Sequence, residues 1–189
     1  ATEGSIKFRN KELTDLSEHE IVRAGVGRKF QTPSIYENLT VFENLEVSFP
    51  RGRGVFGSLT FKKTEDVVER IKEVARDIFL EDFLDMEAAL LSHGQKQWLE
   101  IGMLLMQNPL LLLVDEPAAG MTHQEMDRTV ELLSSLAGEH SVVVVEHDMD
   151  FVRALNSRVT VLHQGSVLAE GNMDQVQNDP KVVEVYLGE

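Results

Sequence analysis

Short apolar runs bounded by polar residues predict the strands of this chain. Residues 26–30, 110–114 and 141–146 each fit one strand, and residues 4–9 alternate apolar and polar positions as a half-buried strand does. The continuous valines within 141–146 are typical of a parallel strand that is covered on both faces of its sheet. Residues 158–163 and 166–170 are joined by Gln164-Gly165, which predicts a β-hairpin.

Capping boxes and helical periodicity predict the helices. In a capping box, a Ser or Thr before the helix and a Glu or Gln three residues later bond each other's free backbone N–H groups. Such pairs are Ser17 with Glu20, Thr40 with Glu43, Ser92 with Gln95, and Thr122 with Glu125. Spacing also predicts an amphipathic helix over 64–80. We assign Trp98, in the helix after Ser92, to packing rather than to stacking on a ligand.

The order of these elements predicts an α/β fold. Strands and helices alternate in the C-terminal half, which is the order that builds a parallel sheet. Residues 32–106 are rich in helical patterns and lack strand signals. We therefore expect them to form a helical subdomain inserted between two parts of the core, 1–31 and 107–189. Within it, residues 50–63 are rich in Gly, Arg and Lys and are expected to form a solvated surface loop.

Composition narrows the class of protein. The 189 residues suffice for one α/β domain with its own core. A net charge of −14 disfavours a nucleic-acid partner, which would need a basic stripe. The chain has no cysteine, which excludes disulfides and thiol chemistry. No apolar run reaches the ~18 residues of a transmembrane helix, so no direct membrane insertion is expected. No signal peptide is visible at the N-terminus.

The segment 91–95 is expected to open a helix that can receive an anion. Ser92 is a good N-cap, and Gln95 completes the capping box. The helix N-terminus presents free N–H groups and the positive end of the helix dipole, which suit phosphate. Gly94 would let a ligand approach the backbone closely. The same pattern taken alone also fits an ordinary helix cap.

Polar side chains follow three of the predicted strands. Gln31 follows the first, Asp115 and Glu116 end the second, and His147 follows the third. Since functional residues of open α/β sheets lie at the carboxyl ends of the strands, we expect these side chains to converge. An Asp at this place can hold Mg²⁺, and a neighbouring Glu can orient or deprotonate a water.

Together and in this order, residues 91–95 and 110–117 resemble the signature loop and the Walker B strand of ATP-binding cassette (ABC) ATPases. The resemblance covers essentially all 189 residues. It implies a P-loop NTPase (RecA-like) core with a parallel sheet and an inserted helical subdomain that ends in the signature helix. It also implies ATP and Mg²⁺ as cofactors and in-line attack of water on the γ-phosphoryl group.

The resemblance implies a role for each strand-end residue. Glu116 corresponds to the catalytic base, and His147 to the switch histidine that contacts the γ-phosphate. Asp115 corresponds to the Walker B aspartate that holds Mg²⁺ through water. Gln31 corresponds to the Q-loop glutamine, which contacts Mg²⁺ or the attacking water and couples to a membrane partner. Positioning and charge stabilisation would supply most of the rate.

The resemblance also implies partners. Ser92, Gly94 and Gln95 correspond to signature residues that meet ATP held by an opposing ATPase subunit, so a homodimer or heterodimer is expected. Transmembrane permease subunits would dock near residues 31–62. This places the protein in the cytoplasm, peripheral on the inner face of the cell membrane.

Three stretches make the resemblance more specific. They are 92–103 (Ser-His-Gly-Gln-Lys-Gln-Trp-Leu-Glu-Ile-Gly-Met), 27–33 and 144–149, and His93 stands where the family more often has glycine. In these stretches the chain resembles the ATPase subunits of urea-type importers, a branch of the branched-chain amino-acid importer group. The solute cannot be derived from the residues, since an ATPase subunit does not touch it.

Two departures from the family pattern are visible. No Gly-x-x-x-x-Gly-Lys-Ser/Thr (Walker A) sequence occurs in the 189 residues. The family places that P-loop, with its strands, upstream of residues 4–9. Because the P-loop holds the β- and γ-phosphates, we expect the 189-residue polypeptide to bind ATP poorly and not to hydrolyse it. In addition, Thr122 stands where the D-loop (118–122) usually has Asp.

Two other functions remain open from the sequence. One is a non-transport ABC protein that acts on nucleic acid, which the acidic charge and the short helical insert disfavour. The other is a catalytically silent interaction module. Co-purification with membrane subunits would distinguish the first from an importer subunit, and an ATPase assay with the upstream segment restored would distinguish the second.

Overall fold

The computed structural model describes residues 4–50 and 64–186, so all but the first residue of the predicted surface loop 50–63 lies outside the described residues. Its central element is a parallel sheet of three strands in the order β3-β4-β5. These are β3 (Val26–Lys29), β4 (Leu111–Asp115) and β5 (Ser141–Val145). Lys29 pairs with Val114, and Asp115 pairs with Val145. The carboxyl ends of all three strands therefore meet at one edge of the sheet.

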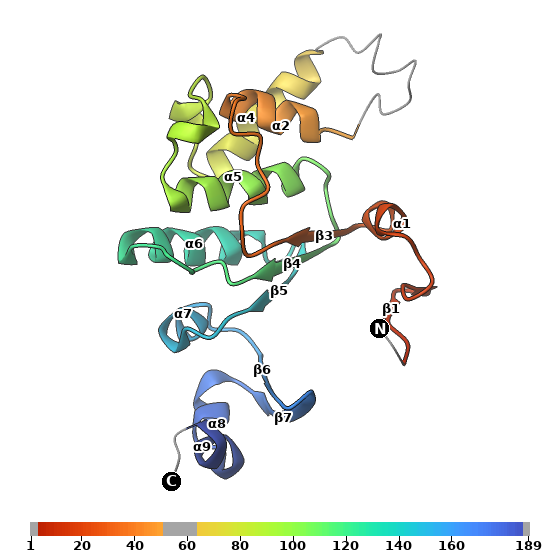
Figure 1. Cartoon of the computed structure of the whole chain (residues 1–189), viewed down its shortest axis with the longest axis vertical. Coiled ribbons are helices and arrows are strands. Elements are labelled where there is room, and N and C mark those ends of the chain that lie inside the picture. The colour runs from red at the N-terminus through yellow and green to blue at the C-terminus, as the bar shows by residue number, and fades with distance from the viewer. Residues whose placement is uncertain (1–3, 51–63, 187–189) are drawn as a thin grey trace.

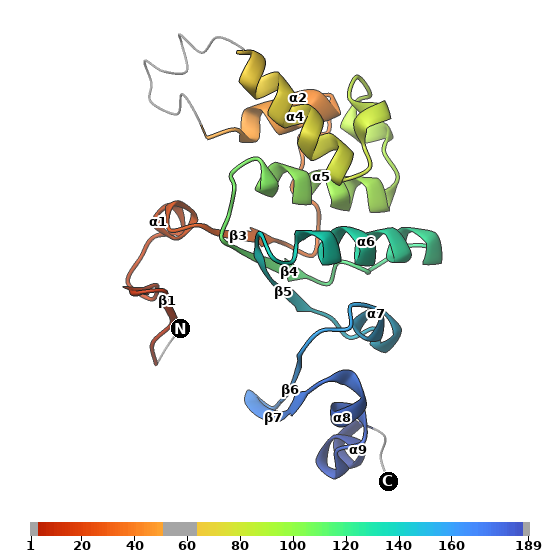
Figure 2. The same cartoon turned by 180° about the vertical axis from the view of Figure 1, so that it is seen from behind.

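Within residues 4–50 and 64–186 the sheet is covered on one face, which corrects the expectation for the valine run. Val142 and Val144 pack against the hydrophobic core, whereas Val143 and Val145 are 48% and 60% exposed. Helices α5 (His93–Leu105) and α6 (His123–Leu136) lie on the covered side (Figures 1 and 2). Among the described residues nothing buries the opposite face of β5, so its side chains alternate between core and solvent.

The helical group above the sheet consists of α2 (Val41–Ser48), α4 (Glu65–Asp77), two short 3₁₀ turns (Glu81–Phe83 and Ala88–Leu90) and α5 (Figure 1). Its apolar residues continue without a break into the core that lies between α5, α6 and the covered face of the sheet. A Cβ at Gly102 would lie 2.5 Å from Ile78 Cδ1 and 3.1 Å from Leu45 Cδ2. Glycine at this position therefore lets α5 approach α2 and α4 closely.

All four predicted capping boxes are present in the structure. They begin α1 (Glu18–Arg23), α2, α5 and α6 at Ser17, Thr40, Ser92 and Thr122. Helix α4 lies within the predicted amphipathic helix 64–80, and it buries apolar residues of one face, including Ile71 and Val74. Trp98 is 3% exposed and donates from Nε1 to Thr129 Oγ1 at 2.9 Å, so its assignment to packing is confirmed.

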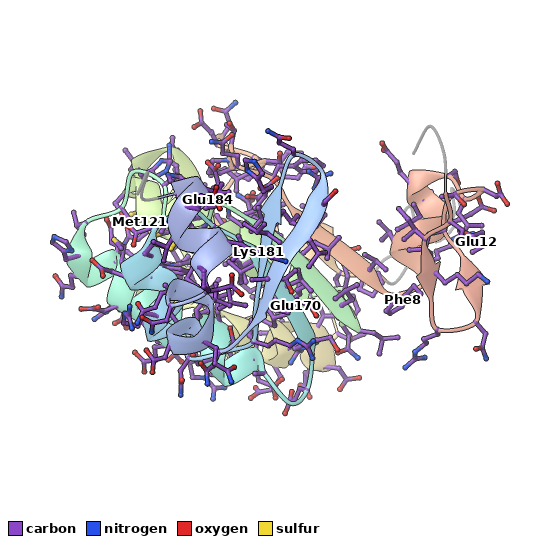
Figure 3. The ribbon with its side chains drawn as sticks, turned by 90° about the horizontal axis from the view of Figure 1, so that it is seen from below. Phe8, Glu12, Met121, Glu170, Lys181 and Glu184 are labelled. Carbon is purple, nitrogen blue, oxygen red and sulfur yellow. The ribbon has the colours of Figure 1, made fainter. Side chains whose placement is uncertain are left out.

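The N-terminal strand prediction is wrong in its extent. Of residues 4–9, only β1 (Lys7–Phe8) is a strand, and it pairs antiparallel with β2 (Lys11–Glu12) rather than with the parallel sheet. The chain reverses at Arg9, whose φ of 54° is left-handed, and this ends the strand. Figure 3 shows Phe8 and Glu12 on this hairpin, to one side of the rest of the molecule.

The C-terminal part of the described chain contains the predicted hairpin. Helix α7 (Met149–Ala154) leads to the antiparallel hairpin of β6 (Val159–His163) and β7 (Ser166–Gly171). Gln164 and Gly165 both have positive φ, as the two-residue turn requires. Helices α8 (Met173–Gln177) and α9 (Pro180–Tyr186) end the described chain. No helix in the described ranges combines the length and apolar character that crossing a membrane requires.

Candidate functional site

Side chains from three loops meet where the parallel strands end. Gln31 Nε2 donates to Glu116 Oε2 at 2.5 Å, and His147 Nδ1 lies 3.6 Å from Glu116 Oε1. The expected convergence of strand-end residues is therefore confirmed. The side chain of His147 is 77% exposed and that of Glu116 is 30% exposed. A small ligand can thus reach the imidazole and the carboxylate from solvent.

The backbone fixes the position of Glu116. Its φ is 42°, a left-handed conformation that costs energy in a residue other than glycine. Its N–H donates to the carbonyl of Val145 at 2.9 Å, which ties the turn after β4 to the end of β5. The carboxylate is therefore held by both the sheet and its own strained turn.

Asp115 lies beside Glu116 but has a different partner. Its Oδ2 is 3.3 Å from Arg28 Nη2, and the Arg28 guanidinium stacks 4.7 Å from the centre of the Phe30 ring. Asp115, Glu116 and Gln31 offer carboxylate and amide oxygens, the donors that Mg²⁺ prefers. In the described ranges no three His, Cys, Asp or Glu side chains form a metal cluster. Proteins usually bind Mg²⁺ through one or two carboxylates together with water and substrate phosphates, so Asp115 and Glu116 are the side chains that could hold it.

Glu146 organises the loops around this site, and the sequence reasoning missed it. Its side chain is 1% exposed. Oε1 accepts from the N–H of Ala118 at 2.8 Å, and Oε2 accepts from the N–H groups of His147 and Asp148 at 2.9 and 3.2 Å. The carboxylate thus joins the loop after Glu116 to the loop that carries His147. The sequence signal that could have drawn attention to Glu146 is a charged residue directly after an apolar strand.

The signature residues lie at the N-terminus of α5. Ser92 is exposed and caps the helix, and its capping box with Gln95 is formed. His93 Nε2 lies 3.1 Å from the carbonyl of Ala119, which connects this helix end to the loop after Glu116. Ser92 and Gly94 are thus placed near that loop, but no hydrogen bond is recorded between them and the Gln31–Glu116–His147 group in the described structure.

Glu125 occupies the donors that were expected to be open to an anion. Ser92 Oγ donates to Glu125 Oε1 at 2.8 Å, while Thr122 N and Oγ1 both donate to Oε2 at 2.9 Å. A Cβ at Gly94 would lie 2.6 Å from the Glu125 carboxylate, so the glycine leaves room for it. Backbone hydrogen bonding from Thr122, with further bonds from Ser92 and Gly94, holds the pKa of Glu125 below its usual value.

A shallow hollow of about 240 Å³ lies beside this carboxylate. Ser92, Gln95, Trp98, Glu125 and Arg128 contribute to its lining. The hollow thus combines a helix N-terminus with one acidic and one basic side chain.

Fold and site define the class: an α/β protein whose hydrolytic and metal-binding candidates lie at the ends of parallel strands. Residues 1–119 match the family described as ABC transporter, and residues 166–189 match the Branched-chain amino acid ATP-binding cassette transporter family. The chain belongs to the ABC transporter family and is, by family, an ABC-type ATPase. The resemblance to ATPases of the branched-chain amino-acid importer group is confirmed.

Two amino-acid transport ATP-binding proteins are similar to this chain over its whole length. The branched-chain amino acid transport ATP-binding protein BraF of Pseudomonas aeruginosa is 34% identical over 100% of this chain and 77% of its own length. The probable LivG protein of Archaeoglobus fulgidus is 38% identical over 100% of this chain and 75% of its own.

Solved structures confirm the fold class. An ATP-binding cassette of an ABC transporter in its ADP conformation superposes with a TM-score of 0.80 at 34% identity, over 99% of this chain and 78% of that one. A nucleotide-free cassette gives 0.82 at 33% identity, over 100% of this chain and 79% of that one. The predicted domain boundaries and the roles of individual site residues remain predictions.

Proposed function

We propose that this chain is the ATP-binding and hydrolysing part of an ABC importer subunit for branched-chain amino acids or urea. The observation that carries the proposal is the convergence of Gln31, Glu116 and His147 at the ends of parallel strands. Relatives named as branched-chain amino acid transport proteins support the first solute. The motif sequences resemble urea-type importers and support the second.

In this proposal each residue has a separate task. Glu116 accepts the proton of the attacking water or orients that water, and Gln31 holds the Glu116 carboxylate through its amide. His147 donates to the γ-phosphate from an exposed position at the same edge. Asp115 would hold Mg²⁺, by the family pattern through water, and would then give up its contact with Arg28. The Mg²⁺ ion would neutralise charge on the phosphate oxygens.

Ser92, Gly94 and Gln95 would act on ATP held by an opposing ATPase subunit. The exposure of Ser92 supports this, because its hydroxyl can be reached from outside the chain; Gly94 is buried, and Glu125 would have to give up its bond from Ser92. The dimer can be a homodimer or a heterodimer. Permease subunits would dock near residues 31–62, and the protein would be peripheral on the cytoplasmic face of the membrane.

The 189 residues contain no Gly-x-x-x-x-Gly-Lys-Ser/Thr sequence, and this bears on what the polypeptide does alone. Backbone N–H groups and the lysine of that loop hold the β- and γ-phosphates. We infer that the 189-residue polypeptide by itself binds ATP poorly and does not hydrolyse it, and that a polypeptide extended upstream by a P-loop segment does; a catalytically silent interaction module is the alternative.

The test compares ATP turnover by the 189-residue chain, by a version extended with the P-loop segment of a relative, and by the extended Glu116→Gln variant. We expect turnover from the extended protein alone, with the variant binding ATP normally but losing turnover by a factor of at least about 100. Glu131→Gln, on the exposed side of α6, is the matched control. Substantial turnover by Glu116→Gln, or by the 189-residue chain, would contradict the proposal.

Solute and partners need a second measurement. The extended subunit is co-purified with the membrane subunits of a urea importer or of a branched-chain amino-acid importer. ATP turnover of each complex with its binding protein is then measured with urea, with leucine and without solute. Stimulation by one solute identifies the importer. Failure to bind any membrane subunit would favour a non-transport ABC protein.

A further inference from the structure

Behind the strand-end site lies a buried polar cluster formed by Lys29, Gln97 and Glu100. Their exposures are 0%, 1% and 5%. Gln97 and Glu100 are three residues apart on α5 and therefore share one face of the helix. Lys29 ends β3, two residues before Gln31. Burying such groups costs free energy unless they are bonded, so their partners indicate what they hold in place.

The two α5 residues hold the backbone on both sides of Gln31. Glu100 Oε1 accepts from the N–H of Ser34 at 3.2 Å, and the carboxylate also accepts a backbone hydrogen bond from Phe30. Gln97 Nε2 donates to the carbonyl of Gln31 at 3.4 Å. Three backbone groups between Phe30 and Ser34 are thus bonded to one face of the signature helix.

Lys29 adds a buried positive charge to the same place. Its Nζ donates to the carbonyl of Phe30 at 2.9 Å and to that of Asp115 at 3.4 Å. Burial lowers the pKa of Lys29, and the carboxylates of Glu100, Asp115 and Glu146 oppose that shift. Burial likewise raises the pKa of Glu100. The cluster therefore connects the ends of β3 and β4 with α5.

Packing alone does not explain why polar side chains occupy these buried positions. Gln97 Oε1 and Glu100 Oε2 are buried oxygens without a hydrogen-bond partner in the described structure. A buried acceptor left unpaired is unfavourable, and apolar residues of similar volume often replace buried charges without loss of stability. Polar groups retained at such a cost are expected to have a task in the site they face.

We propose that Gln97 and Glu100 are positioning residues that set the place of Gln31 relative to Glu116. Gln97 lies about one turn and Glu100 about two turns from the Ser92 end of α5. Through these two side chains, α5 connects its Ser92 end to the backbone of Gln31 and so to the Glu116 carboxylate. A displacement of the Ser92 end is thereby carried to the Gln31 backbone. The catalytic consequence rests on the proposed function, in which Gln31 and Glu116 act in hydrolysis.

The first arm of the test uses the 189-residue chain and needs no nucleotide. Glu100→Ala removes the acceptor of the Phe30 and Ser34 amides but keeps a good helix former. We expect hydrogen exchange of both amides to rise about tenfold or more, and the Gln31 side-chain amide signals to lose the shift caused by Glu116. Glu100→Gln retains an acceptor oxygen and should keep the Gln31 signals in place.

Glu37→Gln is the matched control. Glu37 also connects α5 to the segment after Gln31, through Lys96 Nζ at 3.0 Å, but its side chain is 61% exposed. It should leave the Gln31 signals unchanged. If Glu100→Ala does not fold, Gln97→Ala gives the same test, because it removes the bond to the Gln31 carbonyl. Unchanged Gln31 signals in the folded variant would overturn the proposal.

The second arm measures ATP turnover by the polypeptide extended with a P-loop. Glu100→Ala should lower kcat about ten- to a hundredfold with little change in KM, as misplacement of a catalytic group does, and Glu100→Gln should restore most of kcat. An unchanged kcat would overturn the link to hydrolysis. If the unsubstituted extended protein does not hydrolyse ATP, the proposed function fails, while the first arm still decides whether the cluster positions Gln31.

Discussion

At the scale of single residues, Glu125 joins the N-terminal ends of two helices. It completes the capping box of α6, and its other oxygen accepts from Ser92 Oγ at the start of α5. A carboxylate among free N–H groups is favourable because the positive ends of both helix dipoles point at it. Any phosphate that binds Ser92 and Gly94 must therefore displace this carboxylate or share its donors.

The lowered pKa of Glu125 makes this junction sensitive to acid. A carboxyl group whose folded pKa lies below its unfolded value contributes stability above the unfolded value, near 4.5, and loses it as pH falls through the folded pKa. Glu125→Gln keeps the capping-box geometry but removes the charge. We expect it to cost about 1 kcal/mol at pH 7 and less at pH 3, where more of the carboxylate is protonated, measured by urea unfolding.

The control for this prediction is Glu131→Gln, an exposed position on the same helix. It should cost little at either pH. A cost of Glu125→Gln that is equal at pH 7 and pH 3 would show that the carboxylate charge does not stabilise the junction.

The sequence predicted the strand-end residues but not their buried supports. Gln31, Asp115, Glu116 and His147 could be found because every parallel strand of one sheet ends at the same edge, a rule that needs no coordinates. Glu146 also ends a predicted strand, but its role as a buried support could not be found in this way, and Glu100 could not be found at all. A carboxylate in a strand end or a helix has no pattern that reveals which distant N–H groups it accepts from; that depends on tertiary placement.

At the scale of elements, helix starts were predictable because a capping box is a local bond pattern. Thr40, Ser92 and Thr122 each cap a helix whose third residue returns the bond. How closely the helices pack against one another was less predictable from the sequence. Gly102 in the middle of α5 lowers helix propensity, and only the structure shows that the side chains of α2 and α4 take up the space a Cβ would need.

Gly102→Ala tests that close approach. The new Cβ would lie 2.5 Å from Ile78 Cδ1 in the buried core. Overpacking should cost about 1–3 kcal/mol and outweigh the gain in helix propensity of roughly 1 kcal/mol. Urea unfolding of the 189-residue chain measures the change in free energy of unfolding.

A second substitution identifies the contact responsible. Ile78→Val removes Cδ1 and alone should cost about 0.5–1.5 kcal/mol. Because it also makes room for the new methyl group, the double variant should be more stable than the sum of the single costs implies. Additive costs would show that the contact between Gly102 and Ile78 does not limit the approach of the helices.

At the scale of the whole molecule, the two faces of the sheet differ. The hydrophobic core extends from α4 through α5 to β4 and α6 on one face. The valine run predicted two covered faces, yet alternate valines of β5 are largely exposed. A continuous apolar run shows that both faces of a strand can be buried. Whether they are buried depends on elements from other parts of the chain, which the run itself does not specify.

Threonine substitutions in β5 measure this difference between faces. Threonine also favours strands, so the exchange changes polarity more than strand propensity. Val143, 48% exposed, should tolerate threonine within about 0.5 kcal/mol. Val144, which packs against the core, should lose about 1–2 kcal/mol because its replacement buries a hydroxyl. Urea unfolding of the 189-residue chain gives both values.

Light scattering at increasing protein concentration completes the comparison. An exposed apolar sheet face promotes association between molecules, so Val143→Thr should reduce scattering relative to the unsubstituted chain. Val144→Thr should not reduce it, since its side chain faces the core. Equal losses of stability for the two variants, with no change in scattering, would mean that both faces of β5 are covered in solution. The arrangement expected from the valine run would then hold, and the one-sided sheet would be wrong.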